Sequence, residues 1–308
     1  MGPTILHNTS TIIEGNHPIL QLTSGTITLL GRKGGLAEAH FNLNKEGSFC
    51  AQYNISHSKS ELYTILDGKV EIEYDNQRWA LKVGETIDAS IYNKLITFYA
   101  ITDAKVLLNM DACFYERNFF EMQSLQEEME AVARVDGYTY HHCDRIRKYA
   151  IEVWKKFNQP SENLKLLRWG AYLHDIGKLA IPLEILNKPG KLTPEEWTIM
   201  KTHSIKGADI LRAHKIEWLE DVAFIIEQHH ERYDGKGYPF GLKGDEISIE
   251  AAIVSVVDAY DAMTTERVYK EAMSPEEAIY ELKKGKGTQF HPAAVDNFIK
   301  CLQENKFD

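Results

Sequence analysis

The residues most able to do chemistry in this sequence are histidines and aspartates spread over its second half. His174 and Asp175 are adjacent and supply an imidazole nitrogen and a carboxylate from neighbouring backbone positions. Such a pair can hold one divalent metal, and the carboxylate has a second oxygen with which to reach another. The dipeptide alone is weak evidence. It gains weight from the other members of the set, which are His142, His203, His229, His230 and Asp258.

The composition limits the classes of protein to which the chain can belong. Its 308 residues, 44% hydrophobic and 26% charged, are typical of a globular protein with a sizeable core. The formal net charge of -10 argues against binding to a nucleic-acid polymer. No apolar run approaches the ~20 residues that span a bilayer, and no secretory signal is evident. Four scattered cysteines indicate reduced thiols, so we expect a cytoplasmic protein without a membrane segment.

The first third of the chain predicts a β domain. Short alternating segments are separated by turn signals, and Asp67-Gly68 predicts a hairpin turn between two of them. Residues 82–85 predict another turn. The expected strands cover residues 27–30, 60–66, 70–74, 79–83, 96–100 and 106–110. Their spacing is typical of a small sandwich or barrel.

This region resembles a cupin in part. The first cupin motif is matched at Gly47, His57, Glu61 and Gly68, and residues 81–86 are similar to the turn that opens the second. Ile55 stands where the other motif histidine is expected, and there is no histidine around residues 90–93. The resemblance therefore implies a cupin-like β-barrel at residues 1–113 that senses an unknown small ligand or dimerises. A cupin-type metal enzyme is the less favoured interpretation.

Residues 114–135 predict a linker helix. They contain no Gly or Pro, and an apolar stripe follows a 3-4-3 spacing at Met122, Leu125, Met129 and Val132. Two arrangements remain open. The helix packs on its own domains, or it forms a parallel two-helix coil that makes a homodimer.

From residue 136 onward the periodicity is helical almost throughout. Helices are expected at residues 162–173, 194–211, 219–231, 249–264, 275–283 and 292–302. Ser161, Thr193 and Ser274 are plausible N-caps, because the last two precede a proline and an acidic first turn. The fold class expected for the whole chain is thus a small β-barrel followed by an all-α domain at residues 136–308.

The helical region closely resembles the HD-GYP family of cyclic dinucleotide phosphodiesterases, which lies within the HD hydrolase superfamily. The resemblance covers residues 136–303. It rests on four motifs, which are His174-Asp175-Ile176-Gly177-Lys178, His229-His230-Glu231, Asp234-Gly235-Lys236-Gly237-Tyr238-Pro239 and Asp258-Ala259-Tyr260-Asp261. A segment around His142 precedes them.

The resemblance implies a binuclear metal centre. Its ligands would be His142, His174, Asp175, His203, His229, His230 and Asp258, with Asp175 bridging the two ions. Two such ions activate a water and neutralise phosphoryl charge, which is the chemistry that phosphodiester hydrolysis needs. The family commonly binds iron, so we expect two irons, with manganese as a substitute. Some members hold a third metal with a glutamate four residues before the first histidine, where this chain has Tyr138. His141, His214 and His291 fall outside the pattern.

The resemblance also implies substrate contacts. Lys178 lies three residues after Asp175 and would contact the scissile phosphate, which makes these two the expected catalytic residues. Arg267 and Lys270 match basic positions that contact substrate phosphates. Tyr238 and Asp261 are further candidates; Asp261 could equally cap local backbone groups.

The function implied is hydrolysis of cyclic di-GMP to pGpG, and further to GMP, by a metal-bridging hydroxide. Two alternatives remain open. One is another cyclic dinucleotide, such as cyclic GMP-AMP, as the substrate. The other is an inactive receptor that binds a cyclic dinucleotide, although the complete ligand set favours catalysis.

Overall fold

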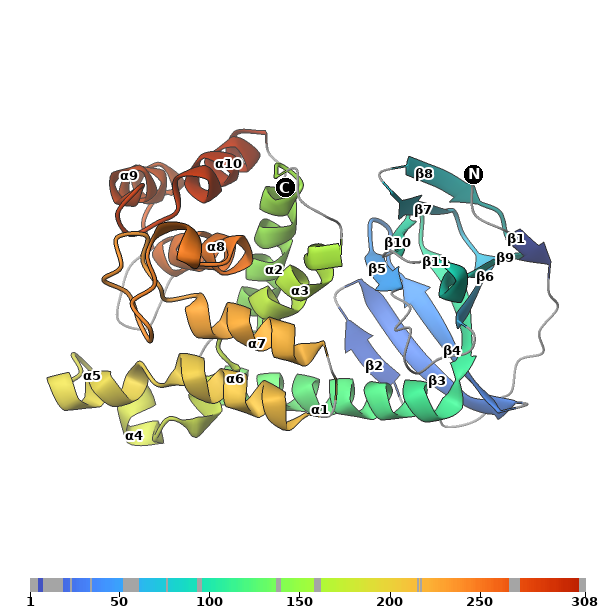
Figure 1. The fold of residues 1–308 in the computed structure, drawn as a ribbon, viewed down its shortest axis with the longest axis horizontal. Helices are drawn as coiled ribbons and strands as arrows, with labels where there is room; N and C mark the ends of the chain where they lie inside the picture. Colours follow the sequence, from blue (N-terminus) through green and yellow to red (C-terminus); the bar gives the residue numbers. More distant parts are fainter. Residues whose placement is uncertain are drawn as a thin grey trace. The chain divides into compact units, whose positions relative to one another are not determined.

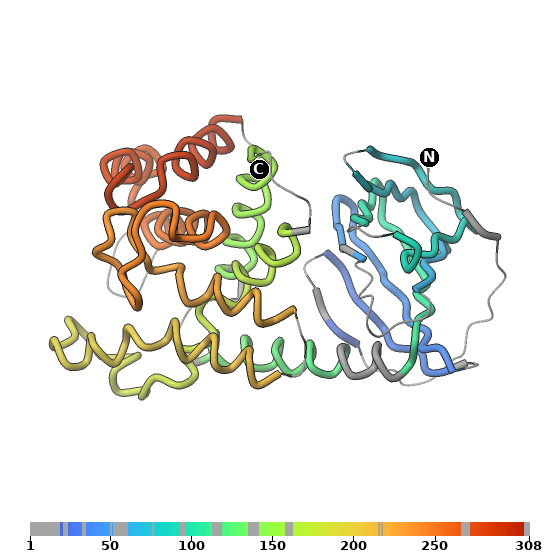
Figure 2. Tube along the Cα trace, viewed as in Figure 1, coloured from blue at the N-terminus to red at the C-terminus, as the bar shows by residue number. Residues whose placement is uncertain are grey.

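A computed structural model provides the structure of the chain. It describes residues 5–7, 19–22, 24–33, 35–51, 61–75, 77–92, 96–136, 140–157, 162–214, 216, 218–265 and 272–304. The chain divides into two compact units, residues 1–124 and 125–308. This division lies inside the predicted linker helix. Figure 2 follows the chain from the strands of the first unit, in blue and cyan, into the helices of the second.

The first unit consists of two antiparallel sheets. The larger has the strand order β1-β9-β6-β11-β4-β3-β2, and the smaller has the order β5-β10-β7-β8 (Figure 1). The strands are β1 (Ile5–His7), β2 (Ile19–Leu22), β3 (Gly25–Lys33), β4 (Leu36–Leu43), β5 (Ser48–Ala51), β6 (Glu61–Asp67), β7 (Val70–Tyr74), β8 (Gln77–Leu81), β9 (Glu85–Asp88), β10 (Ile96–Ala100) and β11 (Ala104–Asp111). A short 3-10 turn, η1 (Ala89–Ile91), follows β9.

One hydrophobic core joins the inner faces of the two sheets. Ile65 and Val106 of the larger sheet and Ile72 of the smaller one belong to the same buried cluster. Phe49 and Phe98 stack within it with ring centroids 4.5 Å apart. The predicted β domain is therefore confirmed, and apolar side chains of both sheets fill its interior.

The predicted hairpin at Asp67-Gly68 is wrong. β6 pairs with β9 and β11 in the larger sheet, whereas β7 pairs with β8 and β10 in the smaller one. The turn therefore carries the chain from one sheet to the other. Gly68 has a φ of +82°, and a Cβ there would lie 2.3 Å from the carbonyl oxygen of Asp103. The glycine is required by this close approach and not by a two-residue hairpin.

The second unit is all helical, as predicted. After α1 (Ala112–Asp136) come α2 (Tyr140–Trp154), α3 (Glu162–Leu173), η2 (Ile176–Ala180), α4 (Leu183–Leu186), α5 (Pro194–Met200), α6 (His203–Ala213), α7 (Leu219–Gln228), η3 (Gly244–Glu246), α8 (Ile249–Thr264), α9 (Pro275–Gly285) and α10 (Pro292–Gln303). Thr193 and Ser274 each form a capping box with the glutamate three residues later, so these two predicted caps are confirmed. Ser161 lies outside the described residues. None of the helices in the described part of the chain is long and apolar enough to cross a membrane.

α1 packs on its own chain along the predicted stripe. Leu125, Met129 and Val132 are buried, and Met122 packs against the core of the first unit. Of the two arrangements that the sequence left open, this burial favours packing of the helix on its own domains.

The single helix predicted at residues 194–211 is two helices. Thr202 Oγ1 donates to the Ile199 carbonyl, and His203 Nδ1 contacts the Met200 carbonyl at 2.8 Å. These side chains bind the last carbonyls of α5 and end it, so that α6 begins at His203. The break places a predicted metal ligand at the first position of a helix.

Candidate metal centre

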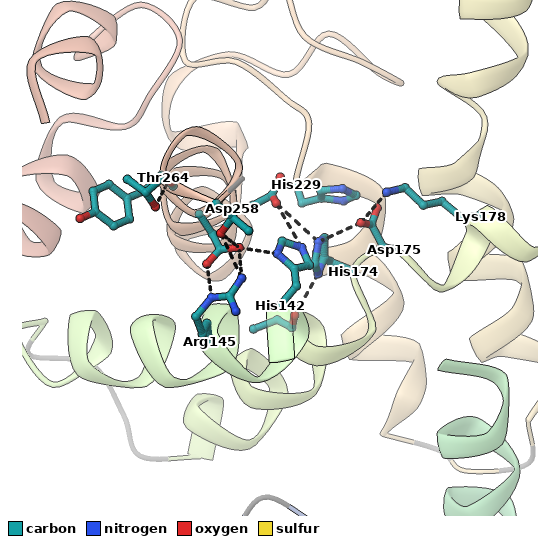
Figure 3. Close-up of polar contacts among 12 residues, drawn as sticks. His142, Arg145, His174, Asp175, Lys178, His229, Asp258 and Thr264 are labelled. Atoms are coloured by element: carbon teal, nitrogen blue, oxygen red, sulfur yellow. Dashed lines mark hydrogen bonds and ion pairs between the residues drawn. The ribbon is translucent and has the colours of Figure 1, made fainter. Parts of the chain in front are cut away.

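Six of the seven predicted ligands lie at or beside helix ends in the second unit, and the seventh lies within a helix. His142 lies in the first turn of α2, His174 and Asp175 follow α3, and His203 begins α6. His229 and His230 directly follow α7, and Asp258 lies in α8. Figure 3 shows His142, His174 and Asp258 facing one another, with Lys178 pointing toward Asp175.

A close backbone crossing holds two of these segments together. A Cβ on Gly177 would lie 1.8 Å from the carbonyl oxygen of His203 and 2.4 Å from the amide nitrogen of Gly207. Only glycine lets η2 lie this near to α6. The crossing fixes His174 and Asp175 beside His203.

The histidines and Asp258 form two clusters, each of which offers three ligand atoms within 4.8 Å of one another. One cluster is His142, His174 and Asp258; the other is His203, His229 and His230. In the second cluster, Nε2 of His203 lies 3.4 Å from Nε2 of His229 and 3.1 Å from Nε2 of His230. Three ring nitrogens thus converge on one small volume.

The tautomers of this second cluster favour a cation. Nδ1 of His229 lies 2.6 Å from the Ile226 carbonyl oxygen, which can only accept, so Nδ1 carries the proton. His203 Nδ1 is bound to the Met200 carbonyl in the same way. Burial, followed by the neighbouring rings, lowers the pKa of His229 well below its ordinary value and that of His230 to about 3. With Nδ1 protonated, the neutral rings of His203 and His229 point their Nε2 lone pairs at each other, and a metal ion would relieve this arrangement.

The first cluster also favours a cation. Among the described residues, the buried Nε2 of His174 has no hydrogen-bond partner of good geometry, although Asp175 Oδ2 lies 3.3 Å away. Burial opposes protonation of this ring, but Asp175 and Asp258 outweigh burial and raise its pKa to about 9. Asp258 Oδ1 lies 3.8 Å from His174 Nε2 and 3.6 Å from His142 Nε2. Carboxylates that stabilise a proton on this nitrogen also suit a divalent metal, which would take the place of the proton.

Asp175 faces both clusters. Its Oδ2 lies 3.3 Å from His174 Nε2, whereas its Oδ1 lies 3.6 Å from His203 Nε2. Lys178 Nζ lies 2.8 Å from Oδ2. Burial opposes ionisation of this carboxyl, but Lys178 and His174 hold its pKa well below the ordinary value. The side chain is therefore an anion with one oxygen available to each cluster.

Tyr238 lies beside the second cluster. Its ring centroid is 4.9 Å from that of His230, at an interplanar angle of 30°. Burial, with Asp175 and Asp258, raises the pKa of its phenol, which keeps the hydroxyl protonated. Arg267, Lys270 and Tyr138 lie outside the described residues, as do His57 and the side chain of His141.

Asp261 is not where a substrate contact is expected. Its side chain is 2% exposed, and Oδ2 lies 2.6 Å from His142 Nδ1. Arg145 binds the same carboxylate through Nε and Nη2 at 2.6 and 2.8 Å. Asp261 therefore lies behind His142, where it is placed to orient that ring, and the predicted substrate contact, which this burial disfavours, stays a prediction. The three-residue spacing of Asp258 and Asp261 puts both on one face of α8, a signal that the sequence did contain.

Glu231 was missed as a functional residue. Its buried carboxylate accepts the backbone amides of Phe240, Gly241 and Leu242 at 2.6, 3.0 and 3.1 Å. It thus anchors the loop that carries Tyr238. Only the tertiary structure brings these three amides to Glu231, although the glutamate stands next to the histidine pair.

Comparison with known families identifies this domain. Residues 124–294, more than half of the chain, match the HD domain family. The chain belongs to the HD domain family. This confirms the superfamily that the sequence motifs indicate.

Relatives of the HD domain are phosphodiesterases by name. The chain is 38% identical over 180 residues to the cyclic di-GMP phosphodiesterase response regulator RpfG of Xanthomonas campestris, covering 58% of this chain and 48% of that protein. It is 38% identical to a cyclic di-GMP phosphodiesterase of Thermotoga maritima, and the match covers 62% of this chain and 51% of that protein. It is 35% identical to the 3'3'-cGAMP-specific phosphodiesterase 2 of Vibrio cholerae, covering 59% and 34%. The chain thus spans about half or less of the length of these relatives.

Solved structures match each unit at low scores. A cyclic GMP-AMP specific phosphodiesterase of V. cholerae aligns over 59% of this chain and 49% of its own, with a TM-score of 0.47 and 19% identity. An RmlC-like cupin of Shewanella frigidimarina aligns over 34% of this chain and 93% of its own, with a TM-score of 0.27 and 13% identity. Scores this low carry no argument about fold or function.

Proposed function

We propose that the chain is a metal-dependent phosphodiesterase that hydrolyses cyclic di-GMP to pGpG, and then to GMP. The observation that carries the proposal is the position of Asp175, which has one carboxylate oxygen toward each of two three-ligand clusters. Relatives named as cyclic di-GMP phosphodiesterases support the substrate class.

Different residues of this chain would have different roles in the reaction. One ion would be held by His142, His174 and Asp258. The other would be held by His203, His229 and His230. Asp175 would contribute a ligand to each. Bound there, the ions would lower the pKa of a water and neutralise phosphoryl charge. Lys178, already 2.8 Å from Asp175, would present its ammonium to the scissile phosphate. Tyr238 would line the substrate side of His230, and Arg267 and Lys270 would bind the substrate phosphates.

The expected metals are two irons, with manganese as a substitute. Histidine nitrogens mixed with carboxylate oxygens suit both metals. Two ions are proposed and not three, because Tyr138 replaces the glutamate that holds a third metal in some HD-GYP proteins. A neutral phenol is a poor ligand.

Cyclic GMP-AMP is the second candidate substrate. Relatives named as specific for it are 33–36% identical to this chain, close to the identity of the cyclic di-GMP enzymes. The complete ligand set argues against the third alternative, an inactive cyclic dinucleotide receptor.

The test is a product assay with iron- or manganese-loaded protein. Cyclic di-GMP, cyclic GMP-AMP and bis(p-nitrophenyl) phosphate are incubated separately, and the products are separated. Linear dinucleotide is the expected product, and a double variant H174A/D175A should lose turnover together with metal. Binding of a cyclic dinucleotide without any cleavage would favour the receptor, and full activity of the double variant would show that the centre lies elsewhere.

Three further expectations remain predictions. They are a small ligand for the β unit, a cytoplasmic location, and a homodimer through α1. A dimer formed by the stripe of α1 would require Leu125, Met129 and Val132 to leave their buried positions in their own chain.

A further inference from the structure

α5 and the residue that caps its end place an aromatic side chain and a cation near the second metal cluster. None of the seven residues of α5, all of which are described, is buried. Trp197 is 47% exposed, which is unusual for a residue that normally buries most of its large apolar surface. Its exposure is therefore not explained by a role in the core of the helical unit.

Trp197 and Lys201 lie on one face of the helix. They are four residues apart, and the amide of Lys201 donates to the carbonyl of Trp197 at 3.0 Å, so the helical geometry continues to Lys201. Within the described part of the chain, Lys201 forms no ion pair. The face therefore offers a π surface and an ammonium side by side.

This face meets the site through Tyr238. The Trp197 ring lies 6.3 Å from the Tyr238 ring at 82°, and Lys201 Nζ lies 5.9 Å from the same ring. The Tyr238 ring also lies near those of His230, at 4.9 Å, and His203, at 6.5 Å. A series of adjacent side chains thus leads from a predicted metal ligand out to an exposed tryptophan.

The chemistry of the face matches one nucleotide. A nucleobase stacks on an exposed indole, and base–aromatic stacking is tolerant of base identity. An ammonium beside the stack pairs with a phosphate. A cyclic dinucleotide has two bases and two phosphates, so binding one phosphate at the metals leaves one phosphate and the bases to be held elsewhere.

We propose that Trp197 and Lys201 form a subsite that binds the half of the cyclic dinucleotide directed away from the metal clusters. Trp197 stacks on its base, and Lys201 pairs with its phosphate. The subsite rests on the proposed phosphodiesterase function, and it assigns substrate affinity to α5, which contributes no predicted metal ligand.

Steady-state kinetics with cyclic di-GMP test the subsite. W197A should raise KM by roughly 5- to 100-fold with kcat nearly unchanged, the range expected for one lost base stack. W197F should recover most of this loss, because a phenyl ring still stacks. K201Q should raise KM by about 3- to 10-fold at low salt, and the difference from wild type should shrink as salt screens the charge. Y280A and K284Q are matched controls on α9, where Tyr280 is 65% exposed, and both should keep the wild-type KM.

Equilibrium binding separates failure of the subsite from failure of the proposed function. The dissociation constant of cyclic di-GMP is measured by calorimetry on metal-free protein, which does not depend on turnover. If wild type and W197F bind cyclic di-GMP more tightly than W197A, the subsite is supported even if cyclic di-GMP is not cleaved. Cleavage by wild type with an unchanged KM and dissociation constant in W197A overturns the subsite and leaves the proposed function intact. Neither cleavage nor binding of cyclic di-GMP by metal-loaded wild type overturns both.

Discussion

Nδ1 of His142 lies 2.6 Å from Oδ2 of Asp261, so the ring nitrogen that faces away from the first metal cluster is held by a buried carboxylate. The opposite nitrogen, Nε2, faces Asp258. Burial opposes ionisation of Asp261, but His142 and Arg145 hold its pKa below the ordinary value. The carboxylate therefore stays charged and fixes both the tautomer and the orientation of the ring.

Replacing Asp261 should weaken metal binding without removing a ligand. D261N keeps the volume of the side chain but loses the charge that orients His142, so we expect a loss of roughly 10- to 100-fold in metal affinity or activity. Metal titration followed by kinetics at saturating metal measures both. D296N, which removes an exposed carboxylate paired with Lys286, should match wild type. Equal metal affinity in D261N and wild type would contradict the orienting role.

The crossing of η2 and α6 should tolerate no side chain at Gly177. G177A places a Cβ 1.8 Å from the carbonyl of His203, and backbone cannot move aside cheaply. We expect the free energy of unfolding to fall by about 1–3 kcal/mol, as it does in overpacked cores, and the metal content to fall with it. G207A is the graded control, since its Cβ would first meet a methyl group of Ile226 at 3.0 Å. Thermal unfolding should place G177A below G207A, and the reverse order would refute the argument.

Glu231 should control the loop that carries Tyr238. E231Q weakens the acceptor for three backbone amides, and each buried group left unsatisfied costs about 1–3 kcal/mol. Amide hydrogen exchange at residues 240–242 should therefore accelerate by roughly 10-fold or more, with a higher KM for substrate. E246Q is the control, because within the described residues the carboxylate of the exposed Glu246 accepts a single backbone amide, that of Lys243. Unchanged exchange at residues 240–242 in E231Q would show that the loop is held by other contacts.

His291 should make folding stability depend on pH. Burial lowers the pKa of this ring, and the nearby Asp245 only partly offsets the effect. The unfolded chain therefore takes up a proton below an ordinary histidine pKa of about 6.5, where the folded chain does not, so stability falls as the pH drops through that value. Above it, His291 is neutral in both states and has no effect.

Denaturant unfolding at about pH 7.5 and about pH 5.5 measures this dependence, on either side of the ordinary pKa. H291Q should lose less stability than wild type over this interval, because the contributions of the other histidines are common to both proteins. An NMR titration of the ring should give a midpoint below the ordinary value. A midpoint above it would reverse the predicted sign.

The structure brings together the candidate ligands that the sequence locates, because each lies at a helix end or on a helix face that local patterns identify. The helices at residues 162–173 and 249–264 begin and end where expected, and they bring His174 and Asp258 to the site. The hairpin prediction was wrong because strand pairing depends on contacts between segments that are far apart in the sequence. The turn signal at Asp67-Gly68 marks a change of direction, but it does not tell which sheet the next strand joins.

The outer residues of the site were harder to predict for the same reason. Asp261 and Glu231 have ordinary sequence surroundings, and their partners come from α2 and from the loop at residues 240–242. The break between α5 and α6 depends on side chains of Thr202 and His203 that bind carbonyls of the preceding turn. The spacing of the apolar residues continues through this break, so periodicity alone predicts a single helix.

The central claim is that two metal ions occupy the two ligand clusters with Asp175 between them. Anomalous diffraction at the iron edge, from crystals of anaerobically purified protein, tests it most directly. We predict two peaks, one bounded by His142, His174 and Asp258 and the other by His203, His229 and His230. A single peak, a third peak near residue 138, or metal bound away from both clusters would contradict the account.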